Sequence, residues 1–398
     1  MRKPELLAPA GDLEKLKIAL LYGADAVFIG GKRFSLRARA SNFDLERIAE
    51  AVEFAHARGK KVYVTTNIIP QDGDLEGFAD YVKQLEAIHV DAVICASAAI
   101  IDIVRKHTNL EIHLSTQQSI TNSKAIAFWA ARGVNRIVLA REVTLDELVP
   151  LTKHAPIDVE VFIHGGMCVS YSGKCTLSNT MTDRDANRGG CAHSCRWNYD
   201  LYDGEDKLNT SMPFSMGSKD LQTVRHVSKL IDLGVASLKI EGRMKSVHYI
   251  ATVVRTYRKL IDDICDDIEV DLPQYLLEIK KAENRLTSHG FMQGMTSVNE
   301  QLYNLRSEQP TQAFVGLVVE YDQTTSTVTF EQRNHFETGD ILEILSPRFE
   351  PVSLKVEGLK DAETSEDITV ARHPKQRLTM RTPIPLEPYD MLRKARVK

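Results

Sequence analysis

Residues 6–29, LLAPAGDLEKLKIALLYGADAVFI, contain the unit that decides the fold. The unit opens on a short apolar run, Leu6–Ala8, and closes on a second, Ala26–Ile29. Between them, apolar residues recur every three to four positions from Asp12 to Tyr22, which predicts an amphipathic helix capped by Asp12. Gly23 is typical of the left-handed residue that ends a helix. The stretch therefore predicts two parallel strands joined by a helix.

The same pattern recurs along the first part of the chain. Six further short runs, rich in Val and Ile, have the composition of strands buried on both faces. They are Val62–Val64, Ala92–Cys95, Ile112–Leu114, Ile137–Leu139, Val159–Ile163 and Leu238–Ile240. Eight βα units in about 250 residues predict an α/β protein with a (β/α)8 TIM-like barrel. A doubly wound sheet is disfavoured, because it needs fewer strands and the chain lacks the glycine-rich motifs that bind phosphates.

One connection of this predicted barrel is much longer than the others. About 70 residues separate the seventh strand from the eighth, at the end of a barrel where loops carry chemistry. A plain loop of that length would be unusual unless it were functional. We therefore expect the barrel to cover residues 1–265, with an insertion at about 164–200.

The predicted secondary structure changes after the barrel. Residues 266–309 predict a helical connector. From residue 310 to 398, short β-type runs alternate with turn signals such as Gly339-Asp340. This last part predicts a small C-terminal β-barrel domain.

Composition sets wider limits. The 398 residues are 43% hydrophobic and 26% charged, which is ordinary for a globular protein of two domains. The formal net charge of −4 means that a nucleic acid would have to contact a local basic patch. No apolar run approaches the ~20 residues that cross a bilayer, and no secretory signal opens the sequence. We expect a soluble cytoplasmic protein without a membrane partner.

Four of the six cysteines gather in the long connection. Cys168, Cys175, Cys191 and Cys195 have the spacing C-x6-C-x15-C-x3-C. Four thiolates suit Zn²⁺ or an iron–sulfur cluster. The tight C-x2-C knuckles of zinc ribbons are absent, so the looser spacing favours a [4Fe–4S] cluster, with zinc and unrelated thiols as the alternatives.

The residues around these cysteines resemble a known family. The matching motifs are EVFIHGGMC at 160–168, SGKCTLS at 172–178, NRGGC at 187–191, SKDL at 218–221 and KIEGRMK at 239–245. They resemble the family long labelled peptidase U32 and, within it, the bacterial tRNA hydroxylation proteins. The resemblance implies a [4Fe–4S] cluster on the four cysteines. It also implies a tRNA-modifying enzyme that converts uridine 34, in the anticodon loop, to 5-hydroxyuridine, with prephenate and not O₂ as hydroxyl donor.

This chemistry makes demands on the residues at the barrel mouth. Prephenate carries two carboxylates, which guanidinium groups bind well. Arginines follow the ends of several predicted strands: Arg37, Arg39, Arg141 and Arg243, with Lys245 close behind. A single arginine at such a position is more often a solvated loop charge, so their convergence from separate loops is the informative feature.

Other polar residues at strand ends could bind a pyrimidine base or transfer a proton. Asn67, Ser115, Thr116 and Gln117 could hold the edge of a uracil. His164 and Glu241 are candidate proton carriers, and together with Arg243 they form the predicted catalytic set. The alternative for His164 is a packed core histidine.

Two other functions remain open from the sequence. A peptidase could use Cys168 and His164 as nucleophile and base, but the chain has no H-E-x-x-H or G-x-S-x-G motif, and the three neighbouring cysteines favour ligation. A non-catalytic RNA-binding maturation subunit, or an enzyme for another RNA base, would have the same motifs. Assembly with itself or with a paralogue is left open.

Overall fold

The computed structural model describes residues 2–36, 42–209, 214–282, 285–302 and 311–395. Eight parallel strands form a barrel: β1 (Glu5–Pro9), β2 (Ala26–Gly30), β3 (Lys61–Thr66), β4 (Ala92–Cys95), β5 (Glu111–Leu114), β6 (Arg136–Val138), β7 (Asp158–Gly165) and β11 (Ser237–Ile240). Strand β11 pairs in parallel with both β7 and β1, which closes the barrel. The predicted TIM-like fold is confirmed.

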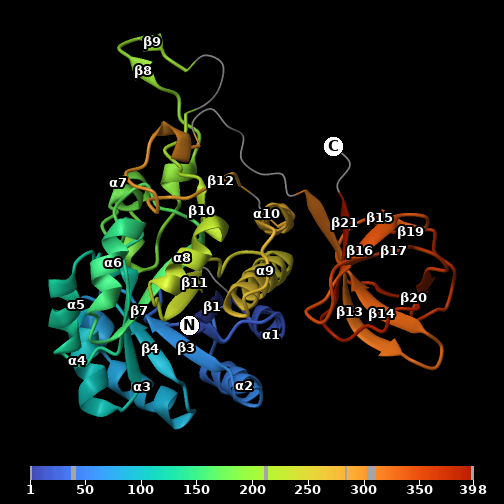
Figure 1. The fold of residues 1–398 in the computed structure, drawn as a ribbon, viewed down its shortest axis with the longest axis horizontal. Helices are drawn as coiled ribbons and strands as arrows, with labels where there is room; N and C mark the ends of the chain where they lie inside the picture. Colours follow the sequence, from blue (N-terminus) through green and yellow to red (C-terminus); the bar gives the residue numbers. More distant parts are fainter. Residues whose placement is uncertain (1, 37–41, 210–213, 283–284, 303–310, 396–398) are drawn as a thin grey trace.

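Helices surround the strands, as Figure 1 shows. They are α1 (Leu13–Leu21), α2 (Leu45–His56), α3 (Phe78–Ala87), α4 (Ala98–His107), α5 (Ser123–Ala130), α6 (Leu145–Lys153), α8 (Val227–Asp232) and α9 (Val247–Cys265). Helix α1 begins where the sequence predicts. The side chains of Asp12 and Asp44 accept from backbone N–H groups three residues on, as N-caps do.

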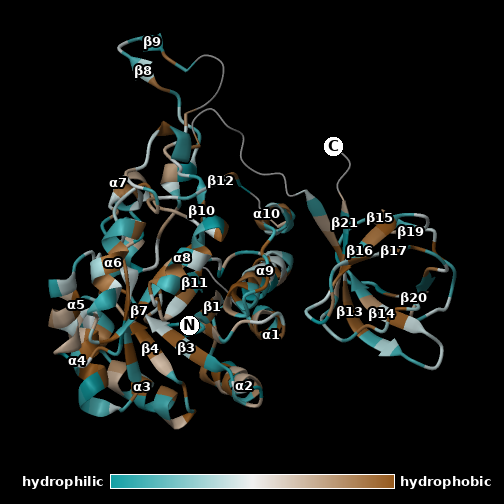
Figure 2. Cartoon of the chain, viewed as in Figure 1, coloured by the Kyte–Doolittle hydropathy of each residue, from teal (hydrophilic) through white to brown (hydrophobic). Residues whose placement is uncertain are grey.

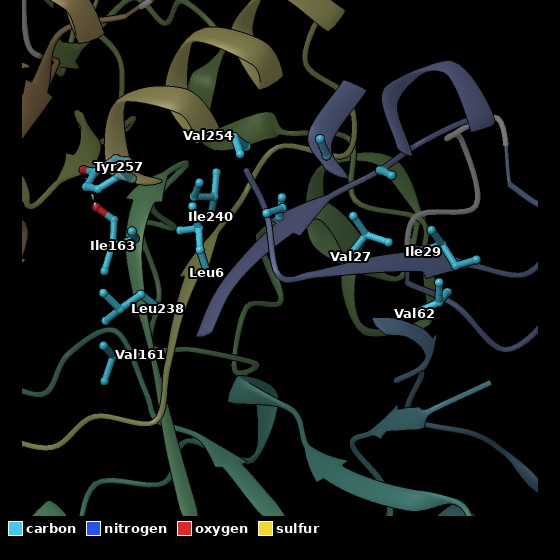
Figure 3. Close-up of a cluster of buried hydrophobic side chains, with 14 of the residues drawn as sticks. Leu6, Val27, Ile29, Val62, Val161, Ile163, Leu238, Ile240, Val254 and Tyr257 are labelled. Carbon is cyan, nitrogen blue, oxygen red and sulfur yellow. Dashed lines mark hydrogen bonds between the residues drawn. The ribbon is translucent and has the colours of Figure 1, made fainter. Parts of the chain in front are cut away.

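The core has an outer and an inner layer. Outward-facing strand residues pack towards the helices, and Figure 3 shows Leu6, Ile163 and Ile240 beside Val254 and Tyr257 of α9. A second cluster lies inside the barrel, formed by Leu7, Ala26, Phe28, Tyr63, Ala92 and Ile94. Figure 2 shows the strands as largely hydrophobic and the helices as mixed. Burial of the strands on both faces explains their nearly unbroken apolar runs.

The barrel interior also holds a buried ion network. Glu160 on β7 is fully buried and accepts from Lys239 Nζ at 2.8 Å and from Arg136 Nη1 at 3.2 Å. Arg136 also pairs with Glu5. Burial alone would raise the pKa of Glu160, but Lys239 and Arg136 bring it down to about 2. The network joins strands β1, β6, β7 and β11 across the barrel.

The long connection between β7 and β11 is built on top of the barrel. It contains the short helix α7 (Leu177–Thr182), the hairpin β8–β9 (Tyr202–Asp203 and Asp206–Lys207), and β10 (Asp220–Gln222). Strand β10 pairs antiparallel with the end of β7 and returns the chain to α8. In Figure 1 the β8–β9 hairpin projects furthest from the barrel. We call residues 166–219 the cysteine insertion.

Residues 266–309, predicted as a helical connector, are helical in one part. Helix α10 (Leu272–Lys280) follows α9. The chain then returns to the top of the barrel, where β12 (Thr287–Ser288) pairs with β10. Residues 303–310 lie outside the described part of the chain.

The C-terminal domain is an antiparallel β domain, as the sequence predicts. One sheet has the strand order β17-β16-β21-β13-β14-β20-β18, and β15 pairs with β19. The strands are β13 (Gln312–Asp322), β14 (Thr327–Gln332), β15 (Phe336–Glu337), β16 (Ile341–Leu345), β17 (Val352–Lys355), β18 (Lys360–Asp361), β19 (Val370–Ala371), β20 (Arg377–Arg381) and β21 (Met391–Ala395). Alternate residues point into its own core, for example Val328 and Phe330 of β14.

This domain packs against the barrel near helices α1, α9 and α10. The Tyr22 hydroxyl donates to the Leu345 carbonyl at 2.8 Å. Arg393, whose side chain is fully buried, contacts Glu278 of α10 and Glu343 of β16. Met391 belongs to the same apolar cluster as the barrel helices. The described part of the chain contains no helix that is long and apolar enough to span a membrane.

Replacing Glu160 by Gln tests the ion network. The native carboxylate has a folded-state pKa of about 2, below the ~4.3 of an unfolded glutamate. Its ionised form therefore adds roughly 3 kcal/mol to the free energy of unfolding above pH ~4.3, and this contribution is lost as the pH falls towards 2. We expect Glu160→Gln to lower the urea midpoint at pH 7 and to weaken the loss of stability between pH 4.5 and 3. Glu53→Gln, on the exposed face of α2, is the control and should change neither. Equal acid profiles for Glu160→Gln and the parent would contradict the assignment.

Candidate functional site

Arg243 lies at the carboxyl end of the barrel strands, in the turn after β11. Its side chain is buried, and Nη1 donates to Ser35 Oγ at 3.0 Å, which in turn lies 2.7 Å from Thr65 Oγ1. A Cβ on Gly30, at the end of β2, would lie 2.1 Å from Arg243 Nη2. The glycine is therefore required by the close approach of the guanidinium. Arg243 links the ends of β11, β2 and β3.

A second group joins the ends of β3 and β5. Asn67 Nδ2 donates to Gln117 Oε1 at 2.8 Å, and Ser115 Oγ donates to the same oxygen at 2.7 Å. Gln117 belongs to the short 3₁₀ turn η2 (Thr116–Gln118) that follows β5. Thr116 is turned away from this group, because its hydroxyl donates to the Leu139 carbonyl at 2.9 Å.

Arg141 and Glu241 approach each other from β6 and β11. Arg141 Nη2 lies 3.8 Å from Glu241 Oε2. The guanidinium also stacks over the Phe162 ring, 3.9 Å from its centroid. Both side chains are more than four-fifths buried. The sequence-predicted Arg141, Glu241, Arg243, Asn67 and Gln117 thus lie at one end of the barrel.

His164 is placed differently from the other predicted catalytic residues. It lies in β7, buried, with Nδ1 3.3 Å from the Tyr257 hydroxyl and its ring against Tyr249 and Tyr257 of α9. Burial lowers the pKa of His164 to about 3. The imidazole is therefore neutral at physiological pH and a weak base.

Lys245 belongs to a cationic cluster that the sequence reasoning missed in part. Asp220 of β10 is buried, and its carboxylate faces Lys245 Nζ at 3.3 Å, Arg196 Nη2 at 3.5 Å and Arg285 Nη1 at 3.5 Å. Burial alone would raise the pKa of Asp220, but the three cations lower it. Burial lowers the pKa of Lys245 in spite of this pairing. Asp220 is thus the shared partner of three cationic side chains.

Hydrogen bonds fold the cysteine insertion back on itself. Arg196, the residue after Cys195, donates from Nη2 to the carbonyl of Met167, the residue before Cys168, at 3.1 Å. This contact brings the first and last cysteines of the motif together, although 26 residues separate them in the sequence.

Two further bonds bring in the other cysteines. The backbone N–H of Ala192, next to Cys191, donates to Ser178 Oγ at 3.0 Å. Asn187 Nδ2 donates to the carbonyl of Cys175 at 3.3 Å. Burial raises the pKa of the Cys195 thiol, and the charges of the other three cysteines act in the same direction, so the four thiols share one neighbourhood.

The donor set of this neighbourhood suits a soft metal centre. Cys168 is exposed and Cys175, Cys191 and Cys195 are partly buried, all as free thiols. Within the described residues, no three His, Cys, Asp or Glu side chains already stand at ligating distances. Four thiols from one folded segment match the ligand type and number of a [4Fe–4S] cluster.

The insertion is seated directly on the turn that carries Gln117. Ser172 makes two hydrogen bonds to the Glu142 carboxylate: its backbone N–H donates to Oε1 at 3.0 Å, and its Oγ donates to Oε2 at 2.9 Å. A Cβ on Gly173 would lie 2.3 Å from the Gln117 carbonyl oxygen. The cysteine insertion therefore contacts the barrel mouth at the turn that carries Gln117.

Two predicted residues cannot be placed, and three residues of the site were not predicted. Arg37 and Arg39 lie outside the described residues. Asp220, Arg196 and Arg285 were not predicted as site residues. Asp220 stands in the SKDL motif and Arg196 directly follows Cys195, so both could have been found there, whereas nothing in the sequence marks Arg285.

The nucleophile–base pair that a cysteine peptidase needs is not formed. His164 faces Tyr257 from inside the fold, whereas Cys168 is exposed in the insertion. No hydrogen bond joins the two residues in the part of the chain that the structure describes. This separation disfavours acyl transfer by Cys168.

Comparison with known proteins gives a consistent result over the whole chain. Residues 11–302 match the model of peptidase family U32, and residues 310–393 match that of the peptidase family U32 C-terminal domain. The chain is 47% identical over 404 residues to tRNA hydroxylation protein P1 of Bacillus subtilis, which covers 99% of this chain and 96% of that protein. It is 34% identical over 398 residues to tRNA hydroxylation protein P of Escherichia coli, covering 87% of each. A collagenase of Porphyromonas gingivalis is 30% identical over 407 residues, covering 98% of this chain and 97% of that protein.

Two glycines of the insertion give a matched test of the contact between the insertion and the Gln117 turn. Gly173 and Gly204 both have positive φ, 74° and 60°, but a Cβ would collide with the Gln117 backbone only at Gly173 and would meet nothing within 4 Å at Gly204. We expect Gly173→Ala to loosen the insertion, seen as faster proteolytic cleavage within residues 166–219. Gly204→Ala carries only the conformational cost of ~1 kcal/mol. Equal cleavage rates in both variants would contradict the seating contact.

Proposed function

This chain belongs to peptidase family U32, and we propose that it is an iron–sulfur enzyme that hydroxylates uridine 34 of tRNA to 5-hydroxyuridine. The convergence of the four insertion cysteines upon the polar end of the barrel carries this proposal. The names of two relatives, tRNA hydroxylation protein P1 and tRNA hydroxylation protein P, support the RNA substrate.

Cys168, Cys175, Cys191 and Cys195 would hold a [4Fe–4S] cluster. When bound through four cysteines, such a cluster would have no open iron, so it would supply one-electron transfer or hold the insertion together. The protein would position the cluster through the hydrogen bond from Arg196 to the Met167 carbonyl and the two hydrogen bonds from Ser172 to the Glu142 carboxylate. These contacts hold the insertion over the Gln117 turn.

The anticodon loop of tRNA is the proposed macromolecular substrate. Tyr171 and Trp197 of the insertion have exposed side chains, 54% and 42% accessible. Aromatic side chains of this kind stack on unpaired bases, which a loop provides. The base would then enter the barrel mouth, where Asn67 and Gln117 offer amides.

Prephenate is the proposed hydroxyl donor. A small dicarboxylate carries two negative charges, which suit a place where Lys245, Arg196 and Arg285 gather around Asp220. Lys245 and Arg285 are both mostly buried, so they would bind carboxylates with little screening by water. Arg141 and Arg243 extend the cationic character of the mouth towards the other strands.

Glu241 is better placed than His164 to move a proton. Its carboxylate reaches the barrel mouth beside Arg141, and 17% of the side chain is exposed. His164 is kept neutral by burial and faces α9. We therefore assign proton transfer to Glu241 Oε2 and a structural role to His164.

Serine replacements test the cluster assignment. Anaerobically purified protein should be brown and contain about four iron and four sulfide per chain, and Cys168→Ser should lose most of both. Cys265→Ser, on α9 and outside the insertion, is the control and should keep the full content. Nucleoside mass spectrometry of tRNA from a strain carrying only Cys168→Ser should show loss of 5-hydroxyuridine. Full iron content in Cys168→Ser would count against the cluster, and retained 5-hydroxyuridine against its role.

Lys245→Met tests the dicarboxylate site. Removing one charge-assisted contact should raise the KM for prephenate ~10- to 100-fold while the KM for tRNA changes little. Lys355→Met, which removes an exposed lysine of β17 in the other domain, should change neither constant. A selective rise in the KM for tRNA would instead assign the Asp220 cluster to RNA phosphates.

A further inference from the structure

One hydrogen-bond donor at the barrel mouth has no acceptor. Gln117 is 8% exposed, and its Nε2 atom is buried without a hydrogen-bond partner among the described residues. A buried N–H that makes no hydrogen bond costs about 1–3 kcal/mol. Such a group in a predicted substrate site points to a ligand that supplies the acceptor.

The orientation of this amide is fixed by the backbone. The N–H of Leu36, which can only donate, lies 3.3 Å from Asn67 Oδ1. Asn67 must therefore turn its Nδ2 towards Gln117, where it donates to Oε1 at 2.8 Å. Turning the Gln117 amide around would set two donors against each other. The chain of bonds leaves Gln117 Nε2, a donor, as the unsatisfied end.

Gln117 stands where the insertion meets the barrel. It follows β5 in the η2 turn, and the backbone of Gly173 is packed against its main chain. Its Oε1 is already occupied by two donors, Asn67 and Ser115. The side chain is therefore held in place, and its remaining N–H belongs to a turn that the cysteine insertion contacts.

We propose that Gln117 Nε2 donates to the C4 carbonyl of a uracil and thereby selects uridine over cytidine. This inference rests on the proposed function and adds its specificity. Uracil has an acceptor oxygen at C4, whereas cytosine has an amino donor there. A cytosine would face the fixed Gln117 donor with a second donor, in a place that water does not reach. Discrimination by a buried hydrogen-bonding group is strong for this reason.

Replacing Gln117 by Glu turns the donor into an acceptor. The glutamate keeps an oxygen for Asn67 and Ser115 and presents a second oxygen to the base. With tRNAs that differ only in U34 or C34, we expect the parent to prefer U34. In Gln117→Glu, kcat/KM for U34 should fall ~10- to 100-fold, and the U34/C34 ratio should fall with it or reverse. Gln117→Met, which has neither group, should lose U34 activity without a gain for C34.

Gln118→Glu is the matched control. It introduces the same carboxylate one residue further on, at a side chain that donates to the Ala96 carbonyl and not to the Asn67 group. Its U34/C34 ratio should equal that of the parent. Iron content and thermal midpoint are measured for every variant, so that a loss of folding is distinguished from a change in specificity.

The outcomes separate this inference from the function on which it rests. Failure of the parent to hydroxylate U34 would overturn the proposed function, whereas an unchanged U34/C34 ratio in folded, iron-loaded Gln117→Glu would overturn the inference alone. Equilibrium binding of U34 and C34 anticodon stem–loops provides a readout without turnover, and the parent's preference should disappear in Gln117→Glu. A rise confined to the KM for prephenate would show that Nε2 binds a carboxylate and would also overturn the inference.

Discussion

The pairing of β11 with both β7 and β1 is the constraint on which the site depends. Because β7 and β11 are parallel neighbours, their carboxyl ends lie side by side, and β10 brings the chain back to this place by pairing antiparallel with the end of β7. Gly165, at the end of β7, has a φ of 112°, and a Cβ there would lie 2.4 Å from the Glu241 carbonyl oxygen. The cysteine insertion is thus anchored at both ends beside the residues that follow β11.

Charge is distributed between the barrel interior and its mouth in different ways. Inside, Glu160, Glu5, Arg136 and Lys239 compensate one another. At the mouth, Asp220 faces three cations. A compensated network serves to hold strands together, whereas cationic side chains gathered in a partly buried place attract an anionic ligand. The two networks therefore correspond to stability and to binding.

Much of the fold could be predicted, because strand burial leaves a direct record in the sequence. All eight apolar runs became barrel strands, and Asp12 and Asp44 cap the helices that follow them. The residues after strand ends could be assigned to one face for the same reason, since parallel strands all end at the same face. The burial of His164 could not be predicted, because inward and outward positions depend on register. Strand β7 pairs with β11 across an irregularity at Lys239/Ile240, which shifts that register near His164.

The sequence by itself determined the barrel, the all-β C-terminal domain and the four clustered thiols, since periodicity and residue type are local properties. The tertiary structure alone decided that Arg285 joins Asp220, because the chain returns from α10 to pair β12 with β10. It also decided that the Gln117 donor has no acceptor among the described residues. That result follows from a chain of hydrogen bonds through Leu36 and Asn67, residues that follow the neighbouring strands β2 and β3 and meet only when these strands pair.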